Sequence, residues 1–127
     1  MRYLVDSCVW IDFFNHKKHF KIITKLLFNN LAVVNEAILA EILPLANLRQ
    51  ERELVECLDG VDCLPLQIDW PEVENIQLRC LKMGMNKLGL LDIVIAQNAK
   101  QNNLTMFSVD KHLRCLCKLL GIKLYKQ

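Results

Sequence analysis

The sequence lacks any apolar run long enough to span a bilayer, and its first residues lack the charged, apolar and small-residue pattern of a signal peptide. It also lacks internal repeats, low-complexity tracts and a linker that would divide it. These absences argue against a membrane-spanning, exported or multidomain protein. We therefore expect one cytoplasmic domain over residues 1–127, with no membrane partner.

Net charge is another feature that is nearly absent. The formal value of +2 at pH 7 is too small to argue for nucleic-acid binding by itself, although it does not oppose an anionic partner. Hydrophobic residues make up 53% of the chain and charged residues 24%, a profile typical of a compact soluble protein. A chain of 127 residues can bury a core without disulfides or a structural metal.

The cysteines do not form a Cys-x-x-Cys pair, so the usual spacing of a structural zinc site is missing, and the segment from His112 to Cys117 does not supply it. Without an export signal we expect reduced thiols, several of which fill apolar positions. The six cysteines are Cys8, Cys57, Cys63, Cys80, Cys115 and Cys117.

Short apolar segments alternate with segments of helical periodicity along the chain. This alternation predicts an α/β fold, a three-layer sandwich in which a central, mostly parallel five-stranded sheet has helices on both faces. The predicted strands are residues 2–5, 31–34, 61–66, 104–107 and 122–125. The clearest helical patterns are residues 18–28, 47–58, 70–83 and 110–120.

Proline and glycine mark two local boundaries. Pro44 interrupts the apolar segment that begins at Asn35, so we expect one helix to end or kink there and a second to follow. Residues 84–89 are framed by two glycines and are predicted to form a loop between helices.

Two acidic residues follow predicted strands. Asp6 comes directly after the first strand, and Asp110 follows the fourth, close to the start of a helix. A strand-terminal Asp is often only a helix cap, and for either residue alone that interpretation is preferred. The carboxyl ends of strands in an open parallel sheet are, however, also where ligands bind.

Two further acids are not explained by capping in the same way. Glu41 lies in mid-helix, where its neighbours three and four residues away include Ile38 and Leu45, so it is expected to project from the apolar stripe. Asp92 lies in an almost wholly apolar segment typical of a buried helix, and capping explains it only if the helix starts there rather than at Leu90 or earlier.

If these four acids converge at the strand ends, their charges must be compensated. Two carboxylates about 4 Å apart repel by about 4 kcal/mol at an effective dielectric constant of about 20. Several such pairs would rival the whole stability of a domain, roughly 5–15 kcal/mol. Either some of the acids are protonated or a cation lies among them. A set of oxygen ligands selects a hard ion, Mg²⁺ or Mn²⁺, which points to phosphoryl chemistry.

Four motifs resemble, in order and spacing, the acidic motifs of PIN-domain nucleases, and most closely those of VapC-type toxins. They are "LVDSCVWIDFF", "AILAEIL", "LGLLDIVIAQNA" and "FSVDKH", at residues 4–14, 37–43, 88–99 and 107–112. The resemblance covers essentially the whole chain. It implies a Mg²⁺- or Mn²⁺-dependent endoribonuclease that cleaves RNA, is inhibited by a cognate antitoxin protein and forms a homodimer.

The resemblance also assigns residues. It makes Asp6, Glu41, Asp92 and Asp110 the catalytic and metal-binding acids. Ser7 takes the position of the small hydroxyl residue after the first Asp, and Ser108 that of the Thr or Ser two residues before the last one.

Two positions depart from the family pattern. Cys8 stands where a small polar residue is usual, and His112 stands where many members have a further Asp. Neither change removes one of the four acids. Basic residues near the predicted rim are candidates for contacts with RNA phosphates, made by charge and without reading sequence: Lys87 in the glycine-framed loop, with Lys82, Lys111 and Arg114.

Other functions for the same architecture remain open. A receiver-type phosphoacceptor domain needs an acceptor Asp after the third strand, where only the weakly placed Asp69 is available. A haloacid-dehalogenase-type phosphatase needs a second Asp at the position of Cys8. A catalytically silent PIN-like module that only binds a partner would keep the same sequence pattern, and Asp92→Asn separates it from an enzyme because only an enzyme loses cleavage.

Overall fold

Four short apolar segments pair in parallel to form the central sheet in the computed structural model, which describes residues 1–126. The strands are β1 (Tyr3–Val5), β2 (Ala32–Asn35), β3 (Asp62–Leu64) and β4 (Thr105–Phe107), in the order β3-β2-β1-β4. All residues of β2 and β4 are buried, as expected for parallel strands covered on both faces. The chain forms β2 and β3 on one side of β1 and then places β4 on its other side. Strand order therefore reverses between β1 and β4.

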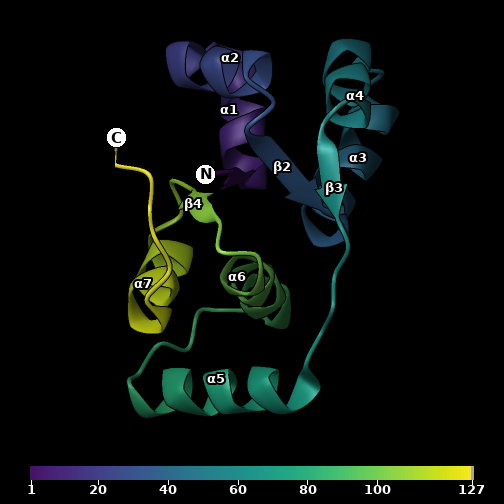
Figure 1. Ribbon diagram of the computed structural model, residues 1–127. Helices are drawn as coiled ribbons and strands as arrows, with labels where there is room; N and C mark the ends of the chain where they lie inside the picture. The colour runs from purple at the N-terminus through teal and green to yellow at the C-terminus, as the bar shows by residue number, and fades with distance from the viewer. Residues whose placement is uncertain (127) are drawn as a thin grey trace.

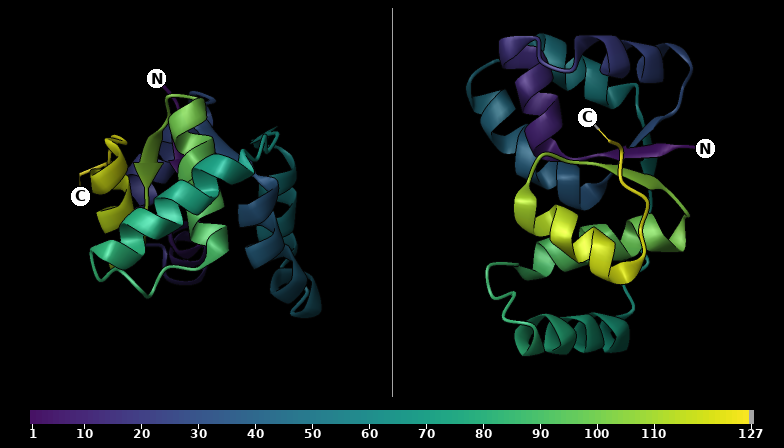
Figure 2. Two further views of the ribbon diagram at one scale, coloured as in Figure 1. Left: turned by 90° about the horizontal axis from the view of Figure 1, so that it is seen from below. Right: turned by 90° about the vertical axis from the view of Figure 1, so that its left-hand side faces the viewer.

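Helices cover both faces of this sheet, which confirms the predicted α/β class. In Figures 1 and 2, α1 and α2 lie on one side of the sheet, α6 and α7 lie on the other, and α5 packs on the far side of α6. No helix among residues 1–126 is long and apolar enough to cross a bilayer. The helices are α1 (Ser7–His16), α2 (Phe20–Phe28), α3 (Glu36–Leu48), α4 (Arg52–Asp59), α5 (Trp70–Lys82), α6 (Leu90–Gln101) and α7 (Lys111–Leu120).

The predicted fifth strand is wrong in extent. Residues 122–125 run parallel to β4 but form only one isolated bridge, between Leu124 and Met106. Two backbone bonds hold this segment: Met106 N–H donates to the Lys123 carbonyl and Tyr125 N–H to the Met106 carbonyl, both at 2.8 Å. A single rung of pairing is too little for a strand, so the sheet has four strands among residues 1–126.

A helix end at Pro44 is also wrong, because α3 continues through it to Leu48, while the alternative of a kink stays a prediction. Proline removes the N–H that would bond to the carbonyl of Ala40, but both residues are exposed, so water can satisfy that carbonyl. The helix ends at Leu48, and Gln50, whose φ of 56° is left-handed, lies in the turn that splits the predicted helix 47–58 into the end of α3 and α4. A Glu51 N–H bond to the carbonyl of Ala46 closes the turn.

Two buried polar contacts position the elements that carry the acids. The indole N–H of Trp10 donates to the carbonyl of Val5 at 3.0 Å, which ties α1 to the end of β1. The Asn35 side chain caps α3 by accepting from Ile38 N–H at 2.9 Å and donates to Asn98 Oδ1 of α6 at 3.0 Å. Asn35 and Asn98 are both fully buried, so the start of α3 is held against α6.

The cysteines are all free thiols, as predicted. Cys80 and Cys117 are buried at apolar positions of α5 and α7, whereas Cys115 is exposed on the other side of α7. Neighbouring cysteines of one helix therefore point in different directions.

Asn98→Ala is expected to destabilise the protein by about 1–3 kcal/mol, because it leaves the buried amide of Asn35 without its acceptor. Urea unfolding measures the change. Asn29→Ala removes an exposed amide bond to the Lys25 carbonyl and should change the unfolding free energy by no more than about 0.5 kcal/mol. Equal effects of the two substitutions would contradict the role given to the buried pair.

Candidate active site at the carboxyl ends of the strands

The site begins where β1 and β4 end side by side. Asp6 follows β1 directly, and its backbone N–H donates to the carbonyl of Phe107, the last residue of β4, at 2.9 Å. Ser108 and Asp110 follow β4, so parallel pairing alone brings them beside Asp6. This is the edge at which open parallel sheets bind ligands, next to the reversal in strand order.

Asp6 is nearly buried, with 6% of its surface exposed, and is held by three donors. Its Oδ2 accepts from the Ser108 hydroxyl at 2.8 Å and contacts the Cys8 thiol at 3.4 Å, while its Oδ1 accepts from Ser7 N–H at 2.9 Å. Burial raises the pKa of Asp6 and the three hydrogen bonds act in the opposite direction, with a net increase. Asp6 is thus both the predicted cap of α1 and a rigidly held carboxylate.

Asp110 caps α7, as the cap interpretation predicts. Its Oδ1 accepts from the backbone N–H groups of His112 and Leu113 at 2.8 and 2.9 Å. Its own N–H donates to the Ser108 hydroxyl oxygen at 3.1 Å. Ser108, which is fully buried, therefore connects the two strand-end acids by donating to one and accepting from the backbone of the other.

Glu41 reaches this site from the middle of α3. Burial is the largest cause of its raised pKa, followed by the charges of Asp6 and Asp92, with a smaller effect of Asp110; the Ser7 hydroxyl lowers it. The Glu41 carboxylate therefore lies within range of the charges of the other three acids. The residue is more exposed than its predicted place in the apolar stripe implies, because the next turn of α3, at Pro44 and Leu45, also faces solvent.

Asp92 lies in the first turn of α6 and is half-buried. The helix begins at Leu90, yet the Asp92 Oδ2 reaches back to accept from Gly89 N–H at 3.0 Å. Asp92 therefore stabilises the helix start from its third position, a local role that the sequence argument did not foresee. The helix that follows is buried from Ile93 to Ala99, as predicted.

Cys8 is the residue whose contribution the sequence did not predict. Its thiol lies 3.4 Å from Asp6 Oδ2 and 3.7 Å from the Ser108 hydroxyl. Burial, with the nearby charge of Asp6, raises the pKa of this thiol to about 11, so it stays protonated at neutral pH and donates to the carboxylate. The only signal in the sequence was its position, two residues after Asp6 in the first turn of a helix.

The four acids supply a set of oxygen donors, but among residues 1–126 no three Asp, Glu, His or Cys side chains come close enough together to form a complete metal site. Local bonds hold three of them: to Ser108 for Asp6, to Gly89 for Asp92 and to the α7 backbone for Asp110. Each carboxylate oxygen can accept more than one bond, and the charges of the other acids contribute to the raised pKa values of Asp6 and Glu41. The donor chemistry therefore fits a hard divalent cation.

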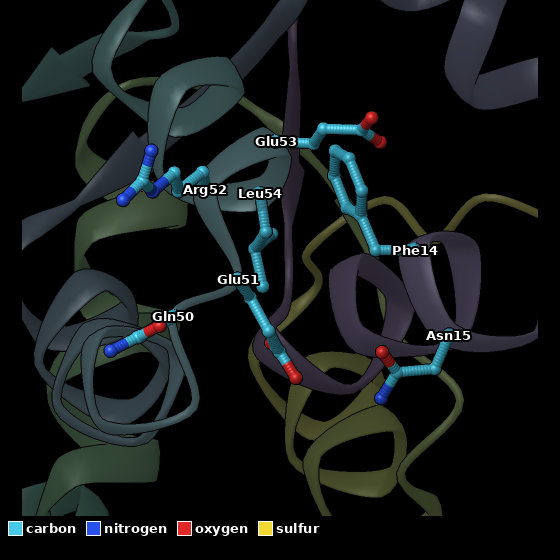
Figure 3. Close-up of a pocket in the computed structure, with 7 residues that line it drawn as sticks. All are labelled: Phe14, Asn15, Gln50, Glu51, Arg52, Glu53 and Leu54. Atoms are coloured by element: carbon cyan, nitrogen blue, oxygen red, sulfur yellow. The ribbon is translucent and has the colours of Figure 1, made fainter.

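A hollow elsewhere on the surface does not add to this site. It lies between the last turn of α1 and the start of α4, and in Figure 3 Arg52 and Gln50 extend away from Phe14 and Asn15. None of the four acids lines it. Lys87 of the predicted rim is exposed in the α5–α6 loop.

The comparisons with known proteins agree with this fold. The family model of the PIN domain matches residues 3–119, whereas no curated protein sequence matches the chain. Solved structures share the fold at low sequence identity, among them the three described next, which are 15–24% identical.

A chain of the VapBC2 complex from Rickettsia felis, bound to a DNA fragment from the promoter, is 15% identical with a TM-score of 0.79, covering 100% of this chain and 99% of that one. A chain of DNA-bound VapBC from Salmonella typhimurium is 17% identical with a TM-score of 0.76, covering 98% and 97%. A domain of a functionally unknown protein from Methanocaldococcus jannaschii is 24% identical with a TM-score of 0.57, covering 99% and 90%.

The matched residues run from the first strand to the last turn of α7, and they include Asp6, Glu41, Asp92 and Asp110. The chain therefore belongs to the PIN-domain family, whose members are generally nucleases.

Proposed function

We propose that the protein is a metal-dependent endoribonuclease that hydrolyses RNA phosphodiester bonds, and that it is the toxin of a VapC-type toxin-antitoxin pair. The observation that carries the proposal is the pair of strand-end carboxylates, Asp6 and Asp110, joined through Ser108 and with their charges acting on Glu41, in a chain of the PIN-domain family. Coupled carboxylates at the strand ends are hard to explain as helix caps alone, since Glu41 is in mid-helix and caps nothing.

The four acids would hold Mg²⁺ or Mn²⁺. When bound, such an ion polarises the scissile phosphate and lowers the pKa of a water molecule. The protein's own contribution is to hold the donors in place. The hydroxyl of Ser108 and the thiol of Cys8 fix Asp6, while the helix starts of α6 and α7 fix Asp92 and Asp110. Glu41 lacks such a backbone anchor in the described chain and is free to adjust.

The proposed partners follow from the family and from the structural neighbours. VapBC2 from Rickettsia felis and VapBC from Salmonella typhimurium are complexes bound to DNA. By analogy, this chain would bind a cognate antitoxin protein, and it would form a homodimer, as the sequence resemblance implies. RNA as substrate and a cytoplasmic location belong to the same proposal.

A silent PIN-like binding module is the second candidate. The observation in its favour is that, among residues 1–126, no three metal-ligating side chains lie close enough together to hold an ion. A receiver-type function is less well supported, because Asp69 caps α5, where its Oδ1 accepts from Glu72 N–H, and α5 packs on the far side of α6.

Asp92→Asn is expected to reduce metal-dependent RNA cleavage by roughly 100-fold or more, the order of loss for a group that stabilises charge in the transition state. The amide oxygen can still accept from Gly89 N–H, so the protein should fold. Purified protein, free of inhibitor, would be incubated with structured and single-stranded RNAs in Mn²⁺, Mg²⁺ or EDTA.

Asp69→Asn is the matched control for this experiment, since it changes an exposed helix-capping Asp outside the site and should cleave like the wild type. Identical fragments from the wild type and the Asp92→Asn protein would assign the cleavage to a contaminant. The binding module would then be the better proposal.

Glu41→Gln is expected to raise the melting temperature of the metal-free protein, because it removes repulsion with three neighbouring acids. The same change should reduce the additional stabilisation by Mg²⁺ or Mn²⁺, since a ligand that binds the native state stabilises it less when its affinity is lower. Thermal melts in EDTA and in each metal measure both effects. Unchanged melts in all conditions would count against a clustered acidic site.

The metal-free protein is also expected to lose stability, through these acids, as pH rises above about 4. Folding raises the pKa of Asp6 and of Glu41, so the native state holds their protons at pH values where the unfolded chain has released them. Their contribution to the unfolding free energy therefore falls with increasing pH.

Comparing urea unfolding of the wild type and Glu41→Gln in EDTA at several pH values isolates the Glu41 contribution from those of the other acids. The difference in stability between the two proteins should grow in favour of the variant as pH rises. A difference independent of pH would show that Glu41 ionises as it does in the unfolded chain.

A further inference from the structure

A shallow hollow next to the acids is lined almost entirely by cations. It has a volume of ≈ 490 Å³ and is formed by Val109, Lys111 and Arg114, from the end of β4 and the first turns of α7, together with Lys126 from the C-terminal segment. No acidic residue lines it. The start of α7 and the C-terminal segment thus bring three positive charges to one concave surface.

These cations have no counter-ion among the described residues. Within residues 1–126 the basic members of the ion pairs are Arg2, His19 and Lys100, none of which lines the hollow. Like charges gathered on one surface repel one another unless an anion is bound between them. The hollow is therefore electrostatically matched to an anion.

Two hydrogen bonds hold the Arg114 side chain in place at the hollow. Its Nη1 donates to the carbonyl of Ser108 at 3.0 Å and to the carbonyl of Tyr125 at 3.4 Å, which joins α7, the end of β4 and the C-terminal segment. A guanidinium carries five N–H donors, so these two bonds leave others available. A planar, anchored guanidinium is well suited to phosphate oxygens.

The hollow is also directly connected to the candidate active site. Ser108, whose carbonyl holds Arg114, donates its hydroxyl to Asp6. Lys111 follows Asp110, and both Lys111 and Arg114 lie within the first turns of the helix that Asp110 caps. An anion bound in the hollow would thus lie beside the acids. The cations of the hollow would hold it there, because the negative charges of the acids repel anions.

We propose that this hollow binds a backbone phosphate of the RNA strand, adjacent to the phosphate that is cleaved. This inference rests on the proposed endoribonuclease function. The cations attract the strand and set its register, so that the next phosphate faces the acids. The contact is independent of base sequence, because it is made to phosphate alone. Lys82 and Lys87, the other cations suggested by the sequence, do not line the hollow.

The test measures RNA binding without cleavage, by adding substitutions to Asp92→Asn and following the fluorescence anisotropy of a labelled single-stranded RNA over a range of KCl concentrations. Lys111→Gln with Lys126→Gln should raise the Kd several-fold. It should also reduce the slope of log Kd against log salt by about 0.7, the value for one phosphate contact on a single strand. Arg114 is left unchanged because its carbonyl bonds are structural.

The matched control removes two exposed lysines on the α2 side of the protein, Lys18→Gln with Lys25→Gln, and keeps the same net charge as the test variant. It should leave the Kd and the slope close to those of Asp92→Asn. Equal effects of both pairs would show that RNA affinity depends on the total charge of the protein and not on the hollow, which would overturn the proposal. A loss of affinity for a polyglutamate peptide, with RNA binding unchanged, would assign the hollow to an acidic protein segment and also overturn it.

Cleavage by the wild-type protein, measured in parallel, separates this inference from the proposed function. If the wild type cleaves RNA but the Lys111/Lys126 variant keeps the same slope of log Kd against log salt, only the proposed phosphate site in the hollow is overturned. Absence of wild-type cleavage on every RNA overturns the nuclease proposal itself.

Discussion

The parallel pairing of β1 with β4 is the constraint on which the rest of the site depends. It places Asp6 beside Ser108 and Asp110, residues about a hundred positions apart, and the bond from Asp6 N–H to the Phe107 carbonyl fixes their register. Ser108 then joins the two acids through its hydroxyl. Without this pairing, Asp6 and Asp110 would be ordinary helix caps at opposite ends of the sequence.

The same edge of the sheet carries an electrostatic conflict that the fold does not remove. Glu41 is brought toward three other acids by α3, and burial adds to the repulsion by raising its pKa. Local hydrogen-bond donors hold the aspartates in place and partly offset the free-energy cost of keeping each carboxylate near the other acids. Close by, Lys111, Arg114 and Lys126 form a concave positive surface. An acidic centre with an adjacent cationic hollow is a suitable arrangement for a polyanion whose charge is met by a metal ion at one phosphate and by side chains at the next.

Capping and function are not competing explanations in this protein. Asp6, Asp92 and Asp110 each satisfy backbone N–H groups at the start of a helix, and each is also part of the acidic group. Helix starts follow strand ends in this architecture, so a residue that caps α1 or α7 is by necessity at the ligand-binding edge. Glu41 is the exception, since it lies in mid-helix, and it is therefore the residue that most clearly distinguishes a site from a set of caps.

The sequence by itself determined the fold class and the four candidate acids, because apolar periodicity, the strand-terminal carboxylates of Asp6 and Asp110, and an acid within an apolar helical segment, as at Glu41 and Asp92, are local patterns that need no knowledge of distant contacts. It misjudged the extent of the last strand and a helix end at Pro44, where solvent exposure and a left-handed Gln50 decide where elements end. Only the tertiary structure decided that the Cys8 thiol contacts Asp6 and that Lys126 joins Lys111 and Arg114. Those contacts depend on side-chain direction and on where the chain returns to the sheet, which are properties of packing and not of sequence spacing.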